Sequence, residues 1–168
     1  MFVLLKPLRL LAKALAALDS PKQLAAGLAL GFAVGLVPKT SLLAHLGLVV
    51  LAAVQVNLAA ATAAALVASL SSFPADPLAH AVGEALLVKA AFLRPLWTAL
   101  YNLPVVPWTG FNNTVTLGWT VLGAALAYPL YRALVGPCER HAPALGARLK
   151  SYKAVQLLLG AEVGSKLS

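Results

Sequence analysis

The chain of 168 residues is 61% hydrophobic and only 11% charged, and its mean hydropathy is +0.86. Lys and Arg number 13 against 5 Asp and Glu, an excess that is common among nucleic-acid-binding proteins. The hydropathy argues against that class, so we expect no nucleic-acid partner. Cys138 is the only cysteine, which excludes a disulfide within the chain.

Two long stretches of the sequence carry no Asp, Glu, Lys or Arg, one at residues 40–75 and the other at residues 95–131. An ionised side chain costs about 3 kcal/mol at the centre of a membrane helix, so such stretches are typical of membrane segments. We predict an all-α integral membrane protein with about four membrane-embedded segments, some of them short or re-entrant. Amphipathic interfacial helices are expected at both ends.

We expect a single membrane domain in four consecutive parts. These are an interfacial amphipathic helix at 1–19, a first helical unit at 20–70, a second helical unit at 76–135, and a basic cytoplasmic or interfacial tail at 136–168. Ten of the 13 basic residues lie near the two ends: Lys6, Arg9, Lys13, Lys22, Arg132, Arg140, Arg148, Lys150, Lys153 and Lys166. Because Lys and Arg are enriched in cytoplasmic flanks, both termini are expected in the cytoplasm, with an even number of crossings.

The first helical unit opens with a helix N-terminus. Ser20 and Pro21, with Gln23 three residues after the serine, have the form of a capping box. The predicted helix reaches Val37 and carries three glycines spaced four apart on one face: Gly27, Gly31 and Gly35. Such a face lets another helix approach closely in a membrane. We interpret these glycines as helix-packing residues, with a backbone surface for a substrate as the alternative.

A turn at residues 38–41 ends this helix, which at about 25 Å barely spans a hydrocarbon core of about 30 Å. The next apolar stretch, 42–70, would be about 43 Å long as one helix, and Gln55 and Asn57 lie at its middle. We predict a break within three residues of Asn57 and two helices of about 13 residues each, as in re-entrant segments. One long, tilted helix is the alternative.

The second helical unit is expected to follow a loop at residues 71–77. Asp76 and Pro77 resemble a second capped helix start, and the amphipathic helix 77–93 should end at Arg94-Pro95. A short helix then leads to an irregular segment at 102–110, which is rich in helix-breaking residues.

Asn112 or Asn113 is expected to cap a spanning helix that ends near Leu134. Aromatic residues lie at both of its ends, as at the two interfaces of a membrane. The tail around Leu145 to Leu159 is interpreted as a separate amphipathic helix.

A weak internal repeat relates the two units. The pattern S/D-P-x-x-x-A-x-G occurs at 20–27 and 76–83, and the pattern V-P-x-T occurs at 37–40 and 106–109. A duplicated pair of interrupted segments points to a pseudo-symmetric, transporter-like core whose turns meet near the membrane midplane. Chance matches in a chain rich in Ala and Leu are the alternative.

The stretch from Ser20-Pro21-Lys22-Gln23-Leu24-Ala25 through Gly31-Phe32-Ala33-Val34-Gly35 and Val37-Pro38 resembles a bacterial membrane family, domain of unknown function 2062. The resemblance covers about residues 15–135, and residues 95–104 with 112–114 are similar to one uncharacterised branch. In two respects the chain departs from the family: Phe73-Pro74 and Asp76-Pro77 replace an asparagine-proline pair, and the first turn carries Lys39. The resemblance implies a bacterial inner-membrane protein, and its branch implies a complex with a larger membrane-anchored envelope protein. It implies no activity.

Six polar residues are candidate functional groups: Lys39, His45, Asn57, Glu84, Asn112 and Asn113. Lys39 is expected to extend to the headgroups, or else to line a water-filled vestibule or meet an anionic ligand. His45 is expected to be a packing residue, with a role in binding a proton or a ligand as the alternative. The asparagines are expected to cap helix ends. His80 and Glu84, four residues apart, can hydrogen-bond to each other, and Glu84 is the best candidate for a titratable functional group. Two such groups are too few to hold a metal, so no metal or cofactor is expected.

The sequence contains no zinc-protease, serine-hydrolase or phosphate-loop motif, so we expect a protein that is not an enzyme. The expected function is a membrane subunit or platform of an envelope complex that handles lipids. Its partners would be membrane lipids and another membrane-anchored envelope protein, whose helix would contact the Gly27-Gly31-Gly35 face or the region beside Asn57. The alternative is a stand-alone transporter of a small solute, with the V-P-x-T turns as re-entrant gates.

Overall fold

The computed structural model describes residues 20–151, with side chains as far as residue 144. The helix predicted at 1–19 and the tail after residue 151 lie outside this range. All regular elements of the described part are helices: α2 (Pro21–Leu36), α3 (Leu42–Ala53), α4 (Leu58–Glu84), the π-helix η1 (Ala85–Lys89), the 3-10 helix η2 (Ala91–Leu93), α5 (Arg94–Tyr101), the 3-10 helix η3 (Val106–Thr109) and α6 (Thr114–Ser151). The all-α prediction is therefore confirmed for these residues.

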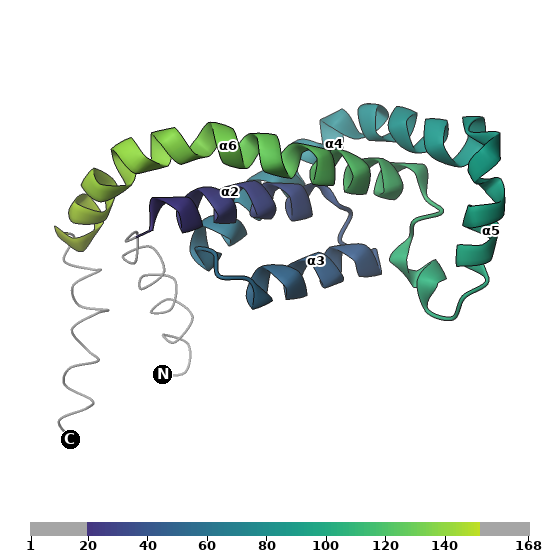
Figure 1. Ribbon diagram of the computed structural model, residues 1–168, viewed down its shortest axis with the longest axis horizontal. Coiled ribbons are helices and arrows are strands. Elements are labelled where there is room, and N and C mark those ends of the chain that lie inside the picture. The colour runs from purple at the N-terminus through teal and green to yellow at the C-terminus, as the bar shows by residue number, and fades with distance from the viewer. Residues whose placement is uncertain (1–19, 152–168) are drawn as a thin grey trace, which may run out of the picture.

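Three helices, α2, α4 and α6, lie along one another and form the bundle (Figure 1). Helix α2 runs parallel to α4, because a side chain on Gly27 would meet the backbone of Asn57 and one on Gly35 would meet Ala65. The contact is a close approach of two backbones, which glycine permits because it has no Cβ. The prediction that the glycine face packs on another helix is confirmed, and that helix belongs to the same chain.

Helix α6 runs antiparallel to both partners. A Cβ on Gly118 would lie 2.5 Å from the carbonyl carbon of Ala79 in α4, and one on Gly123 would lie 2.9 Å from the carbonyl oxygen of Ala33 in α2. The middle of α6, near Tyr131, thus lies beside the start of α2. Both described ends of the chain are at the same end of the bundle (Figure 1).

Helices α2 and α3 form a hairpin. After the turn at residues 37–41, α3 runs back along α2, and the backbone N–H of Asn57 donates to the carbonyl of Gln23 at 3.1 Å. The hairpin therefore returns to the level at which it began, and α4 starts there (Figure 1).

The interior of the bundle is built from small residues. Four alanines are completely buried: Ala25, Ala61, Ala68 and Ala79. The large apolar side chains of α4, in contrast, point outward. Soluble proteins bury their large apolar residues. The opposite distribution is expected where close helix packing, rather than water exclusion, holds the helices together.

The predicted break near Asn57 is confirmed, because α3 ends at Ala53 and α4 begins at Leu58. The first of the two short helices, α3, has 12 residues, but α4 has 27 rather than about 13. The loop predicted at 71–77 is wrong, since α4 continues through Pro74 and Pro77. Buried contacts on both sides of the prolines, at Ala68 and Ala79, hold the helix together where local sequence signals would end it.

The start of α6 agrees with the prediction but its end does not. The helix continues past Leu134 to Ser151 and includes Pro129, Pro137 and Pro143, so the described part of the tail is not a separate helix. Between α5 and α6, the irregular segment contains one short 3-10 helix, and Val105 and Gly110 have positive φ angles of 72° and 70°.

Two helical stretches, Leu58–Lys89 and Thr114–Ala144, are long and apolar enough to cross a membrane. Helices α2 and α3 are apolar but shorter than that. Length and composition thus support a membrane protein with two candidate spans among residues 20–151, and do not show the four segments that the sequence predicts.

Candidate functional site

Lys39 lies at the tip of the hairpin, in the turn between α2 and α3. Its ammonium donates to the backbone carbonyls of Gly35 at 2.8 Å, Val37 at 2.7 Å and Val34 at 3.2 Å. These carbonyls form the negative end of the α2 dipole, which favours a cation there. The side chain folds back and caps α2 instead of extending away from the hairpin.

The two V-P-x-T turns meet beside this tip. A Cβ on Gly110, which follows the second turn, would lie 3.3 Å from the Cβ of Ser41, which follows the first. Ser41 is buried and caps α3 by accepting from the backbone N–H of Ala44 at 3.3 Å. The proximity agrees with the repeat hypothesis. However, Asp76-Pro77 does not start a helix, so the repeat stays a prediction.

Asn57 joins the hairpin to α4. Its side-chain oxygen accepts from the backbone N–H of Ala60 at 2.9 Å and caps α4, and the residue is only 9% exposed. The role predicted for Asn57, a helix cap, is confirmed. The lack of a side chain at Gly27 leaves room for the Asn57 carbonyl.

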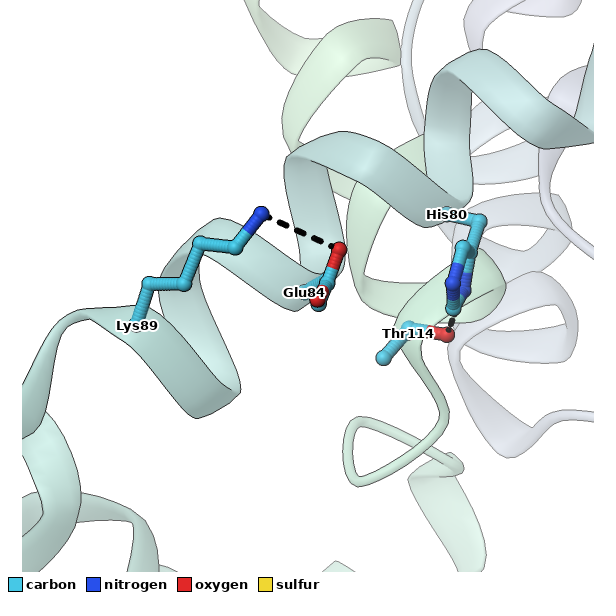
Figure 2. Close-up of polar contacts among 4 residues, drawn as sticks. All are labelled: His80, Glu84, Lys89 and Thr114. Carbon is cyan, nitrogen blue, oxygen red and sulfur yellow. Dashed lines mark hydrogen bonds and ion pairs between the residues drawn. The ribbon is translucent and has the colours of Figure 1, made fainter.

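His80 and Glu84 do not bond each other, although their spacing would allow it (Figure 2). The Nδ1 atom of His80 lies 2.6 Å from the hydroxyl of Thr114 at the start of α6. Glu84 pairs with Lys89 at 3.2 Å. Lys89 ends the π-helix, and in a π-helix residues five apart lie on the same side. The change of helix type at Ala85 thus brings Lys89, rather than His80, to the carboxylate.

The remaining predicted residues are the neighbours Asn112 and Asn113, just before α6, and His45 in α3. Asn113 is the cap of α6, because its side-chain oxygen accepts from the backbone N–H groups of Val115 at 2.9 Å and Thr116 at 3.0 Å. Asn112 is exposed and lines a hollow of about 280 Å³ beside α5. His45 is exposed, and its Nδ1 lies 2.9 Å from the carbonyl of Ser41.

An interaction between Asp76 and Trp119 was not foreseen from the sequence. The indole N–H of Trp119 in α6 donates to the Asp76 carboxylate in α4 at 2.8 Å. Trp119 is 4% exposed and belongs to the bundle core with Leu36, Ala68 and Ala79. The sequence signal for this interaction was Asp76 itself, an isolated acid at the end of a charge-free stretch. The adjacent Pro77 favoured the interpretation of Asp76 as a helix cap.

The polar residues therefore serve as caps and pairs at separate places in the bundle. Within residues 20–151, no three His, Cys, Asp or Glu side chains are grouped to hold a metal ion. Neither a nucleophile with an adjacent base nor a pair of facing carboxylates is formed by the predicted site residues. Their arrangement supports structural roles.

A concave surface lies between α2 and α6, and Leu43 and Gly47 of α3 line part of it. Two hollows of about 320 Å³ and about 210 Å³ adjoin there and share Leu30, Ala124 and Ala127. The first extends to Tyr128 and Tyr131, and the second extends toward the hairpin tip. We call the two together the α2–α6 groove.

No protein-family model matches the chain. No curated protein and no solved structure matches it either. The resemblance to domain of unknown function 2062 therefore remains a proposal, and function has to be argued from the geometry.

Proposed function

We propose that the chain is a non-enzymatic membrane subunit, or platform, of a bacterial inner-membrane complex that handles lipids. The observation that carries the proposal is the distribution of its apolar side chains. The interior contains many Ala and Gly residues and few large side chains, such as Leu36 and Trp119, while Leu66, Leu70 and Phe73 of α4 are 63%, 81% and 81% exposed. Apolar side chains in a stripe of this kind mark contact with lipid or with another protein.

The connectivity supports a membrane topology with cytoplasmic termini. Helices α4 and α6 would cross the bilayer, and the α2–α3 hairpin would enter and leave it from the side on which both described ends lie. Two crossings agree with the even number inferred from the basic ends. The resemblance of residues 15–135 to a bacterial inner-membrane family supports the same location.

The partner surface differs from the one expected from the sequence. The Gly27-Gly31-Gly35 face is filled by α4, so it cannot receive a helix of another chain. The outward stripe of α4 replaces it in the proposal, because Leu66, Leu70 and Phe73 recur every three or four residues and so share one side of the helix. A partner's membrane helix with small or apolar residues fits such a stripe.

The test is crosslinking in native membranes, using the full-length chain with a photoreactive residue at position 70. Position 126 in α6, where Leu126 is 45% exposed, is the matched control. We expect one heteromeric product from position 70 and none from position 126. The variant Phe73→Ala should weaken that product without unfolding the chain. Equal labelling of lipid alone at both positions would overturn the proposed partner contact.

A stand-alone transporter is the second candidate, and it is favoured by the meeting of the two V-P-x-T turns at Ser41 and Gly110. Re-entrant turns that meet inside a membrane are a feature of transporter cores. Purified chain in lipid vesicles would distinguish the two proposals. Saturable uptake of a solute without any partner supports the transporter, whereas no uptake together with a crosslinked partner supports the subunit.

A further inference from the structure

We propose that the α2–α6 groove binds one acyl chain of an anionic phospholipid, whose phosphate is held by Lys22 and Arg132. The inference rests on the membrane location in the proposed function and does not depend on the partner protein. It begins from the lining of the groove, which is apolar and built mainly from small side chains such as Ala26, Ala124 and Ala127. Large side chains on both helices would close the space that these alanines leave open.

The length of the groove suits an extended chain rather than a compact ligand. Its lining on α6 runs from Thr120 to Tyr131, which corresponds to about 16 Å at 1.5 Å per residue. On α2 it runs from Ala26 to Val37, the same number of residues in the opposite direction. The groove therefore follows the helix axes, as an extended acyl chain requires.

Two cations flank one end of the groove. Lys22 precedes Ala26 by four residues on α2, and Arg132 follows Tyr128 by four residues on α6, so each is on the same helix face as a lining residue. Lys22 lies one turn before the first lining residue of α2, and Arg132 directly follows Tyr131, the last lining residue of α6. Because the two helices are antiparallel, both cations are at the same end, and both residues are exposed. The positive end of the α2 dipole is also there.

The tyrosines mark the depth of the headgroup. Tyr128 and Tyr131 line the groove beside the two cations, and tyrosine is enriched at the boundary between hydrocarbon and headgroups. A phosphate at this level would meet Lys22 and Arg132, while its acyl chain would extend along Leu30 toward the hairpin tip. At the opposite end, the Lys39 ammonium lies next to the lining residues Val34 and Val37, but it already donates to their backbone carbonyls. Arg94, at the start of α5, is not among the lining residues.

The test uses the purified full-length chain, without any partner, in detergent with dioleoylphosphatidylglycerol or dioleoylphosphatidylcholine. Native mass spectrometry measures how much lipid each sample retains. We expect stronger retention of the anionic lipid by the unmodified chain. The variant Ala127→Trp fills the groove and should lose this retention, whereas Val67→Trp, on an exposed part of α4, should keep it.

The headgroup contacts are tested by charge removal. Each of Lys22→Gln and Arg132→Gln should weaken retention of the anionic lipid about fivefold, since a base near an anionic surface contributes about that factor. Arg94→Gln is the charge-matched control and should change nothing. If Ala127→Trp does not fold, Ala124→Leu provides a milder filling of the groove at an exposed position.

Three results would overturn the inference. They are equal retention of the two lipids, equal loss in Ala127→Trp and Val67→Trp, and an effect of Arg94→Gln as large as that of Arg132→Gln. If Ala127→Trp abolished a crosslinked complex but not lipid retention, a partner helix would occupy the groove instead. Loss of lipid with the complex intact at position 70 would leave the proposed partner contact standing, so the two proposals fail separately.

Discussion

The substitution Gly31→Ala tests the packing of the bundle most directly. A methyl group at this position would lie 2.6 Å from the Cα atom of Ala61 in α4, and closer still to the Ala61 carbonyl oxygen. Both atoms belong to the backbone and cannot rotate away. Since carbon atoms pack at about 3.5 Å or more, α2 and α4 would have to separate by about 1 Å.

The magnitude follows from two opposing terms. Overpacking costs about 1–3 kcal/mol, and the upper end applies here because the obstacle is backbone. The alanine recovers up to about 1 kcal/mol of helix propensity. We therefore expect Gly31→Ala to lower the free energy of unfolding by about 2 kcal/mol.

Gly136→Ala is the matched control, because a Cβ on Gly136 would have nothing within 4 Å. It gains the same propensity without the clash, so the two variants should differ by about 3 kcal/mol. The assay is unfolding of the full-length chain in mixed micelles of mild detergent and dodecyl sulfate, followed by circular dichroism. Indistinguishable unfolding curves for the two variants would refute the parallel α2–α4 contact.

Three further substitutions test single contacts in the same assay. Asn57→Ala removes the cap of α4 and should cost about 1 kcal/mol; an unchanged midpoint would contradict that role. Trp119→Phe leaves the Asp76 carboxylate without its indole donor and should lower the free energy of unfolding by about 1–3 kcal/mol. In an Asp76→Leu background the same substitution should cost less. Additive losses would mean that the two residues are not coupled. Lys39→Met removes the ammonium from the C-terminus of α2 and should lower the free energy of unfolding by about 1 kcal/mol. Arg94→Gln is the control, because Arg94 is at the N-terminus of α5, and it should not lower this free energy.

Local chemistry was the part of the fold that the sequence could predict. Ser20 caps α2, accepting from the backbone N–H of Gln23 at 3.4 Å, and the break at Asn57 and the turn at 38–41 are where the sequence places them. In each case the deciding interactions are within three or four residues of one another. The structural role of a cap, a proline or a buried amide can therefore be predicted from its neighbours in the sequence alone.

The errors occur where distant packing outweighed those local signals. Asp76-Pro77 has the chemistry of a helix start, yet it lies inside α4, because Ala79 and the Trp119 indole of α6 hold that stretch in the bundle. His80 and Glu84 have the right spacing for a pair. The π-helix and the start of α6 give each of them a different partner.

At the candidate sites too, local features followed from the sequence, and long-range contacts followed only from the packing of the helices. The sequence by itself determined the apolar character of the chain, its basic ends, the hairpin turn and the asparagine caps, because composition and short-range hydrogen bonding are properties of the sequence. Only the tertiary structure decided that the glycine face is filled by α4 of the same chain. It also decided that Lys22 and Arg132 flank one groove, since residues more than 100 positions apart are brought to one end only by the antiparallel packing of α2 and α6.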